Sequence, residues 1–555
     1  MKQLLAIAHT RLTAIGTQSR HRKSRRMQEP TMPRCRLSAH RLIAGIFGTL
    51  LHATAAQAVI DQPMDEASAR AMLNRYGYGA DRTSLQATIG TTPRHYLERA
   101  IRGTPAYPPA LVRQIAASPA AEPLDKLWPL YGPGGSERME KRAAIQPPGS
   151  DIVRSEREVE GRQMLNAASA NRLLESANSD NPGHEALLNF WLNHFSIHGL
   201  KQINKFLAAD YARQMQRAMR EDSFAALLKA SFFHPAMQIY LDNNRSVATD
   251  SAFARQAERR GHQAGINENL ARELLELHTL GVNGGYTQSD VQALARIITG
   301  AGVINNRLPE HALNAPGAER IGYFFFDPNR HDFGDKRLLG RSYPAGRGLD
   351  EIRQALDQLA SHPQTAEHIA GKLARRFLAD EPPAEVVKAM AAAFRNSGGR
   401  ISATLAPLLD SPAFAESLKR PGKFKEPVDY ILSAARAACD GQVIGNGQLL
   451  WRSAQDQGQA PFMRSTPDGY GSQEADWLSP PAIAKRIRLA QTLASRPVPL
   501  AAHASGGDLS ACRPDISAVR AAVGSLSTET RAALAGLSPQ DELTALLASP
   551  EFMRR

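Results

Sequence analysis

The chain has 555 residues, 43% of them hydrophobic and 22% charged, which excludes a wholly disordered protein. Aromatic residues make up only 6%, which disfavours a sandwich of many strands and favours helices joined by long loops. The formal charge of +13 is typical of a nucleic-acid-binding protein, but most of it comes from the start of the chain.

The first 58 residues have the pattern of a secretory signal peptide. A basic segment that ends at Arg41 is followed by the apolar run 42–51 and then by Ala56-Gln57-Ala58, a small-residue cleavage site. The run is too short for a permanent membrane span, which needs about 20 apolar residues. We expect cleavage after Ala58, export to the periplasm or the medium, and no integral membrane segment in the mature chain. Met32 and Met27 are alternative translation starts, and Met32 would give a more compact leader.

Cleavage at this site changes the charge argument. Residues 1–58 hold ten of the 67 basic residues and one of the 54 acidic residues, so the mature chain carries a formal charge of only +4. A surface of this charge gives no reason to expect a nucleic-acid partner.

Residues 59–555 are predicted to form a single large, irregular and mainly α-helical domain with long Pro/Gly-rich loops. A loop-rich insert is expected at about 103–150 and a polar loop at about 440–480. The segments IGYFFFD and KRLLGRSY predict two short strands, and hence a minor β-hairpin near 321–343.

Two cysteines, Cys439 and Cys512, remain after cleavage. In an oxidising compartment such a pair is expected to form a disulfide. Two unpaired buried thiols are the alternative, because the sequence does not show that the two Cα atoms come within reach of each other.

The standard catalytic signatures G-x-S-x-G, C-x-x-C, H-E-x-x-H and the Walker loop are missing from the sequence. Candidate site residues are therefore polar side chains inside apolar segments. The first such segment is FWLNHFSIH (190–198), with Asn193 and His194. His194 and His198 are four residues apart, so on a helix both rings could hold one metal ion. The competing interpretation is a buried histidine that satisfies a backbone carbonyl.

The second segment, residues 267–300, predicts a helical hairpin. Asn267 or Asn269 can cap its first helix, Gly281 can end that helix in a left-handed conformation, and Thr287 with Asp290 forms a capping box for the second.

The first helix of this hairpin carries the candidate residues Arg272, Glu273 and His278. Either at least one of them serves a polar site, or Glu273 is solvated, Arg272 pairs locally and His278 is a hydrogen-bonded core residue.

The third segment is the loop 327–336, with His331 and Asp332. Its oxygen-rich composition suits a hard cation, although the spacing is not that of an EF-hand. An ordinary turn stabilised by Asp and Asn side chains is the competing interpretation.

If the three segments share a site, His194, Glu273 and His331 or Asp332 should converge on one concave surface. A divalent metal is an open alternative for such a site, and no ligand set is predicted for it. A looser gathering with Arg272 or Lys336 among the carboxylates would be an ion-pair network instead.

Eight short motifs are spread over the chain: LNRYGYGA (73–80), FWLNHF (190–195), HPAMQIYLDNNRS (234–246), NENLARELLELHTLGVNGGYTQSDVQALARIITG (267–300), HDFGDKRLLG (331–340), PDGYG (467–471), WLSP (477–480) and SPEF (549–552). Together they resemble one bacterial family, catalogued as domain of unknown function 1800. The resemblance runs from about residue 66 to the end and is most specific in ELHTLGVNGGYTQSD. One departure is Ala301, where members commonly have Trp.

The resemblance implies a mostly helical, exported protein that is often encoded beside a second exported protein. It implies no established activity and no catalytic residues. We therefore expect a binding or assembly protein that acts with a co-encoded exported partner. The alternative is a hydrolase or other enzyme with a His/carboxylate site, with or without a metal.

Overall fold

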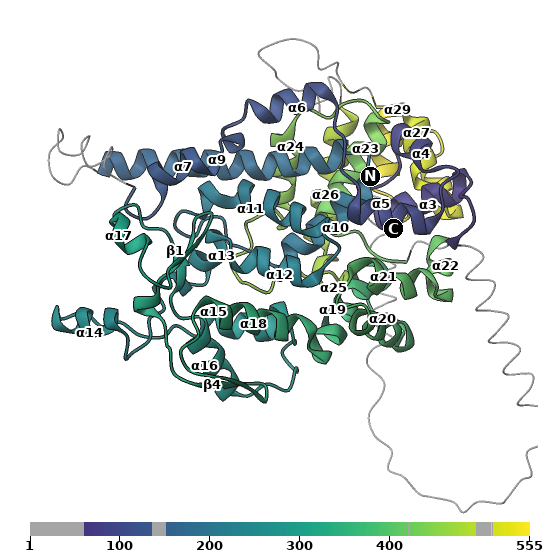
Figure 1. Ribbon diagram of the computed structural model, residues 1–555. Helices are drawn as coiled ribbons and strands as arrows, with labels where there is room; N and C mark the ends of the chain where they lie inside the picture. The colour runs from purple at the N-terminus through teal and green to yellow at the C-terminus, as the bar shows by residue number, and fades with distance from the viewer. Residues whose placement is uncertain (1–59, 136–150, 420–421, 496–511, 513) are drawn as a thin grey trace, which may run out of the picture.

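A computed structural model of the protein describes residues 60–135, 151–419, 422–495, 512 and 514–555 (Figure 1). The predicted signal peptide, its predicted cleavage site at Ala58 and the alternative start at Met32 lie outside the described residues. The described chain is mainly α-helical with two small antiparallel sheets, which confirms the predicted fold class.

The N-terminal helices are short and begin at side-chain caps. The carboxylates of Asp65 and Asp81 and the hydroxyl of Thr92 each accept a hydrogen bond from a backbone N–H in the first turn. These helices are α3 (Glu66–Tyr76), α4 (Arg82–Thr88), α5 (Pro93–Arg102), α6 (Pro109–Ala116) and α7 (Leu124–Tyr131), so the predicted loop-rich insert contains two of them.

The long helix α9 (Asp151–Asn178) crosses the upper part of the molecule in Figure 1 and packs against helices from both halves of the chain. The central helices follow it: α10 (Pro182–His194), α11 (Asn204–Met219), α12 (Phe224–Phe232) and α13 (Pro235–Tyr240). Next come α14 (Ala252–Arg259), α15 (Asn269–Glu273), the π-helix η3 (Leu274–His278), α16 (Gln288–Ile297) and α17 (Glu310–Leu313).

The second half of the chain returns to helices after the sheets. The bounds are α18 (Leu349–Ser361), α19 (Pro363–Phe377), α20 (Ala384–Asn396), α21 (Ile401–Leu409), α22 (Pro412–Lys419) and α23 (Pro427–Cys439). Further along lie α24 (Gly447–Asp456), α25 (Glu474–Trp477), α26 (Pro480–Ala494), α27 (Ile516–Val523), α28 (Thr528–Leu534) and α29 (Pro539–Leu547). The predicted polar loop at 440–480 therefore contains α24, which Asn446 caps.

The two predicted strands belong to different sheets and do not pair with each other. IGYFFFD supplies β3 (Phe324–Phe326), which lies between β1 (Ala301–Val303) and β2 (Glu319–Ile321). KRLLGRSY forms the hairpin near 321–343 by itself, with β4 (Lys336–Leu338) paired to β5 (Arg341–Tyr343). Leu339 and Gly340 both have positive φ, the backbone conformation of a tight two-residue hairpin turn.

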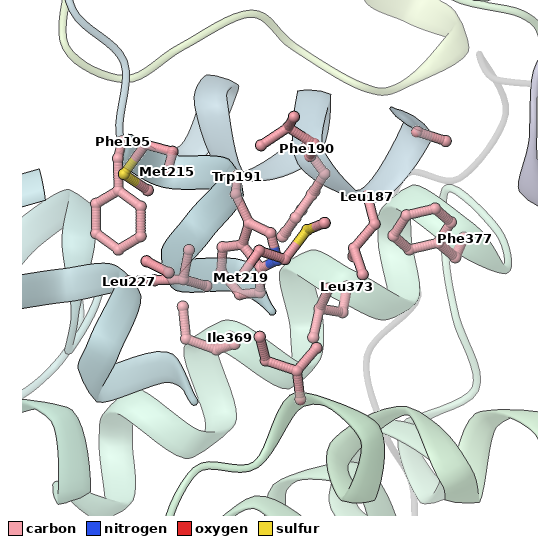
Figure 2. Packing of buried hydrophobic residues seen from close by; sticks show 14 of the residues in the cluster. Leu187, Phe190, Trp191, Phe195, Met215, Met219, Leu227, Ile369, Leu373 and Phe377 are labelled. Carbon is pink, nitrogen blue, oxygen red and sulfur yellow. The ribbon is translucent and has the colours of Figure 1, made fainter. Parts of the chain in front are cut away.

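The apolar core around α10 decides where the polar residues of that helix can go. Figure 2 shows Leu187, Phe190 and Trp191 of α10 packed against side chains of α11, α12 and α19. The apolar side chains Ile369, Leu373 and Phe377 of α19 face this core, and Arg375 lies on the exposed side of the helix.

Cys439, at the end of α23, is joined to Cys512 by a disulfide with a Cα–Cα distance of 5.2 Å. The bond links α23 to the segment before α27, 73 residues later. In the described part of the chain, no helix combines the length and the apolar character needed to cross a bilayer.

Candidate ligand-binding pocket

A pocket of about 370 Å³ lies where α10, α19, the start of α23 and the segment 459–476 meet. This volume is within the usual range for pockets that hold small molecules. The lining is rich in charged and amide side chains, including Arg172, Asn189, Asn193, Lys372, Arg375, Arg376, Glu426, Asp429, Arg464, Asp468 and Asp476.

One wall of the pocket is held by the side chain of Asn193. Its Nδ2 donates to the backbone carbonyl of Tyr470 at 2.9 Å, and its Oδ1 accepts from the backbone N–H of Tyr470 at 2.7 Å. Gly469 allows this close approach, because a Cβ at that position would lie 2.3 Å from the carbonyl oxygen of Asn193. Two motifs of the resemblance, FWLNHF and PDGYG, thus meet at the pocket.

Buried ion pairs form a second wall. Arg376 donates to both carboxylate oxygens of Asp429 and to Oε1 of Glu426, each at 2.8 Å. Burial opposes the ionised form of Asp429, but the charges of Arg376 and Arg555 lower the pKa of this carboxyl overall. Gln459 completes the wall, because it donates to Glu426 and accepts from the N–H of Val428.

The third wall is built on Arg172 of α9. Its guanidinium donates to Glu175, to the buried Glu185 and to Oδ1 of Asn189, while Nδ2 of Asn189 donates to the hydroxyl of Tyr78. Burial raises the pKa of Tyr78 to about 12, so this hydroxyl stays neutral. The charged and amide groups of this wall are therefore hydrogen-bonded to one another.

Lys372 of α19 differs from Arg172, Arg376 and Arg464, the paired cations that line the pocket. It is half-buried and forms no hydrogen bond or ion pair with any described residue. Burial, together with the nearby charge of Arg375, lowers its pKa to about 8. The sequence analysis missed Lys372, although the alternation of apolar and basic residues in KLARRF (372–377) is a signal that could have found it.

His194 lies behind the Asn193 wall and has a structural hydrogen bond. Its Nε2 donates to the carbonyl of His278 at 3.1 Å, as the competing interpretation expects. The ring centroid of His194 is 6.2 Å from that of His278 and 6.3 Å from that of His368. Burial, followed by the charge of Lys372, lowers the pKa of each ring, to about 3 for His278 and about 4 for His368. All three rings are neutral at physiological pH.

The hypothesis that His194 and His198 share a metal ion on one helix is wrong. Helix α10 ends at His194, and Phe195 leaves the helical conformation, so His198 is not on the next turn. Within the described ranges, no group of three or more His, Cys, Asp or Glu side chains is arranged to hold a metal ion.

The hairpin at 267–300 has the predicted caps at Gly281 and Thr287–Asp290. Arg272 pairs locally with Glu268 and Glu276. Glu273 is half-buried, and burial together with the charge of Glu276 raises its pKa. The carboxylate of Asp468 acts on the pKa of Glu273 in the same direction, but Glu273 is not among the residues that line the pocket.

The loop 327–336 forms a separate buried network. Asp332 accepts two hydrogen bonds from Arg296, and Nδ1 of His331 donates to the carbonyl of Thr299 at 2.7 Å. Lys336 pairs with Glu351 at 2.5 Å. The third segment therefore contacts the second helix of the hairpin 267–300, and none of the described hydrogen bonds or ion pairs of His331 or Asp332 reaches His194, Glu273 or His278.

These observations define a mainly α-helical protein with a polar pocket braced by ion pairs between distant segments. The chain belongs to the family described as Protein of unknown function (DUF1800), whose model matches residues 71–554. Neither a curated protein nor a solved structure matches the chain.

Proposed function

We propose that the protein is an exported binding protein that holds a small polar ligand in this pocket and acts with a co-encoded exported partner. The observation that supports binding most directly is the bracing of the pocket. Asn193, Arg376 and Asn189 each link segments far apart in the sequence, through Tyr470, Asp429 and Tyr78, so the cavity is preorganised before a ligand arrives.

A hydrolase with a His/carboxylate site has less support. His194 and His368 donate their Nε2 protons to backbone carbonyls, and His194 is buried while His368 is half-buried. Their lowered pKa values leave them poor bases at neutral pH.

Ligand binding is tested on protein isolated from its own compartment, by native mass spectrometry followed by release and identification of small molecules. Ser196 lines the pocket, and Ser196→Phe should fill it and abolish retention of the ligand. Ser361→Phe, at an exposed position of α18, is the matched control and should retain the ligand. Absence of any bound molecule from the wild-type protein would contradict the proposal.

The partner is tested separately. The signal-peptide pattern and the resemblance to proteins encoded beside a second exported protein support this part of the proposal. Cross-linking in the native compartment, followed by purification, should recover one other exported protein at near-equal amounts. Recovery of the chain alone would remove the partner from the proposal and leave the pocket unaffected.

A further inference from the structure

Not all of the charged side chains that line the pocket have an ion-pair partner. Arg376 is paired with Glu426 and Asp429, Arg172 with Glu175 and Glu185, and Arg464 with Asp468. Lys372 and Arg375 line the same pocket and have no ion pair with a described residue. The remaining lining carboxylate, Asp476, is exposed and accepts a hydrogen bond from the N–H of Gln473.

Lys372 and Arg375 lie on one face of α19. They are three residues apart, a spacing that brings side chains side by side on a helix. The opposite face is anchored in the apolar core by Leu373 and Phe377, as Figure 2 shows. The helix therefore holds both cations at the pocket, with Lys372 half-buried and Arg375 exposed.

The surroundings of the Lys372 ammonium supply almost no compensating negative charge. His194 of α10, His278 of η3 and His368 of α19 are neutral, and Arg375 repels the ammonium. Asp468, in the segment 459–476, attracts it weakly and is already paired with Arg464. Holding an unpaired ammonium in partly buried surroundings is unfavourable, and an anion beside it removes that penalty.

We infer that the pocket binds a small molecule through an anionic oxygen group, a carboxylate or a phosphate, with Lys372 and Arg375 as its counter-charges. This inference rests on the proposed binding function and adds the chemical class of the ligand. Lys372 contacts the anion inside the pocket, and Arg375 contacts the same anion from the solvent-exposed side. The pocket volume of about 370 Å³ limits the ligand to a small metabolite.

The test measures acylation of Lys372 by an activated acetate ester in the full protein, read by peptide mass spectrometry. The probes are inorganic phosphate, citrate and glucose, each compared with sodium chloride at equal ionic strength. At neutral pH, phosphate or citrate should slow acylation of Lys372 about three- to tenfold, because a bound anion raises a lysine pKa by about 0.5–1 unit. Stronger protection by phosphate indicates a phosphoryl ligand, and stronger protection by citrate indicates a carboxylate ligand.

Two controls make the result specific. Lys388 is exposed on α20, and its acylation should not change with any probe. Arg375→Gln should weaken the protection of Lys372 while leaving its acylation measurable. Equal rates at Lys372 with phosphate, citrate and chloride, or equal protection by glucose, overturn the inference.

The inference and the proposed function fail in different ways. If the ligand retained by the wild-type protein is lost from Ser196→Phe but kept by Lys372→Met, the pocket binds a ligand and its anionic class is wrong. If Lys372→Met loses it while Lys388→Met keeps it, the inference stands.

Discussion

The side-chain amide of Asn193 pairs with the backbone of Tyr470, 277 residues further along the chain. This arrangement is like one rung of a sheet, with an amide side chain in place of the second strand. It fixes the segment 459–476 against the end of α10 and so closes one side of the pocket. The close approach requires glycine at position 469, because no side chain fits there beside Asn193.

Asn193→Ala should detach this segment. It removes both hydrogen bonds and leaves two polar backbone groups of Tyr470 without partners, at an expected loss of about 1–3 kcal/mol in the free energy of unfolding. Urea denaturation measures the loss, and amide hydrogen exchange should rise at residues 468–472. Asn283→Ala, at an exposed position, is the control. Equal stability and exchange in both variants would contradict the role of Asn193.

Gly469→Ala should lower the stability of the protein by more than the positive φ of Gly469 alone explains. The left-handed backbone conformation disfavours alanine by about 1–2 kcal/mol, and the Cβ would also lie 2.3 Å from the Asn193 carbonyl oxygen. Gly458→Ala separates the two effects, because Gly458 also has positive φ but nothing lies within 4 Å of its Cβ position. The melting temperature of Gly469→Ala should be clearly lower than that of Gly458→Ala. Similar values would mean that the contact with Asn193 is unimportant.

Arg376→Met should destabilise the protein by about 3–5 kcal/mol at neutral pH, because the buried carboxylate of Glu426 loses its ion pair and that of Asp429 keeps only Arg555. Asp429 has a folded-state pKa below its ordinary value of 3.8, so its stabilising effect is present above that pH and is lost as the pH falls. The difference between wild type and variant, measured by thermal unfolding, should therefore shrink below about pH 3.8. Arg375→Met, one residue away and exposed, should change stability little at any pH. A stability difference between wild type and Arg376→Met that grows as the pH falls would contradict the lowered pKa of Asp429.

Reduction of the bond between Cys439 and Cys512 should lower stability without unfolding the core around α10. Chain-entropy reasoning gives a loop of this size roughly 4 kcal/mol at most. Cys439→Ser and Cys512→Ser should each reproduce the effect of the reductant and become insensitive to it. Thiol titration in denaturant gives the check, because equal thiol titres with and without prior reduction would show that the bond is absent.

Export should remove the first 58 residues. N-terminal sequencing of the exported protein is expected to begin at Val59, directly after Ala56-Gln57-Ala58. A gene that starts at Met32 should support the same export, since the basic segment and the apolar run remain. An exported chain that still contains Arg41 would contradict the cleavage site.

The sequence by itself determined the features that depend on neighbouring residues. The mainly helical class, the Thr287–Asp290 capping box and the left-handed end at Gly281 were all predictable, because each involves groups within about one or two turns of chain. Arg272, Glu273 and His278 could likewise be selected as candidate site residues, because the apolar residues around them are their neighbours in the sequence. Their partners were not predictable, because those partners come from elsewhere in the chain.

Only the tertiary structure decided which polar residues share a site. It placed His331 and Asp332 in a network of their own, in which Arg296 pairs with Asp332 and Lys336 with Glu351. It also brought Lys372, Asp429 and Tyr470 to the pocket beside Asn193, where no local pattern links them. The free energy of a buried ion pair or an amide brace depends on which distant helices pack together, and that packing is a property of the whole core rather than of any one segment.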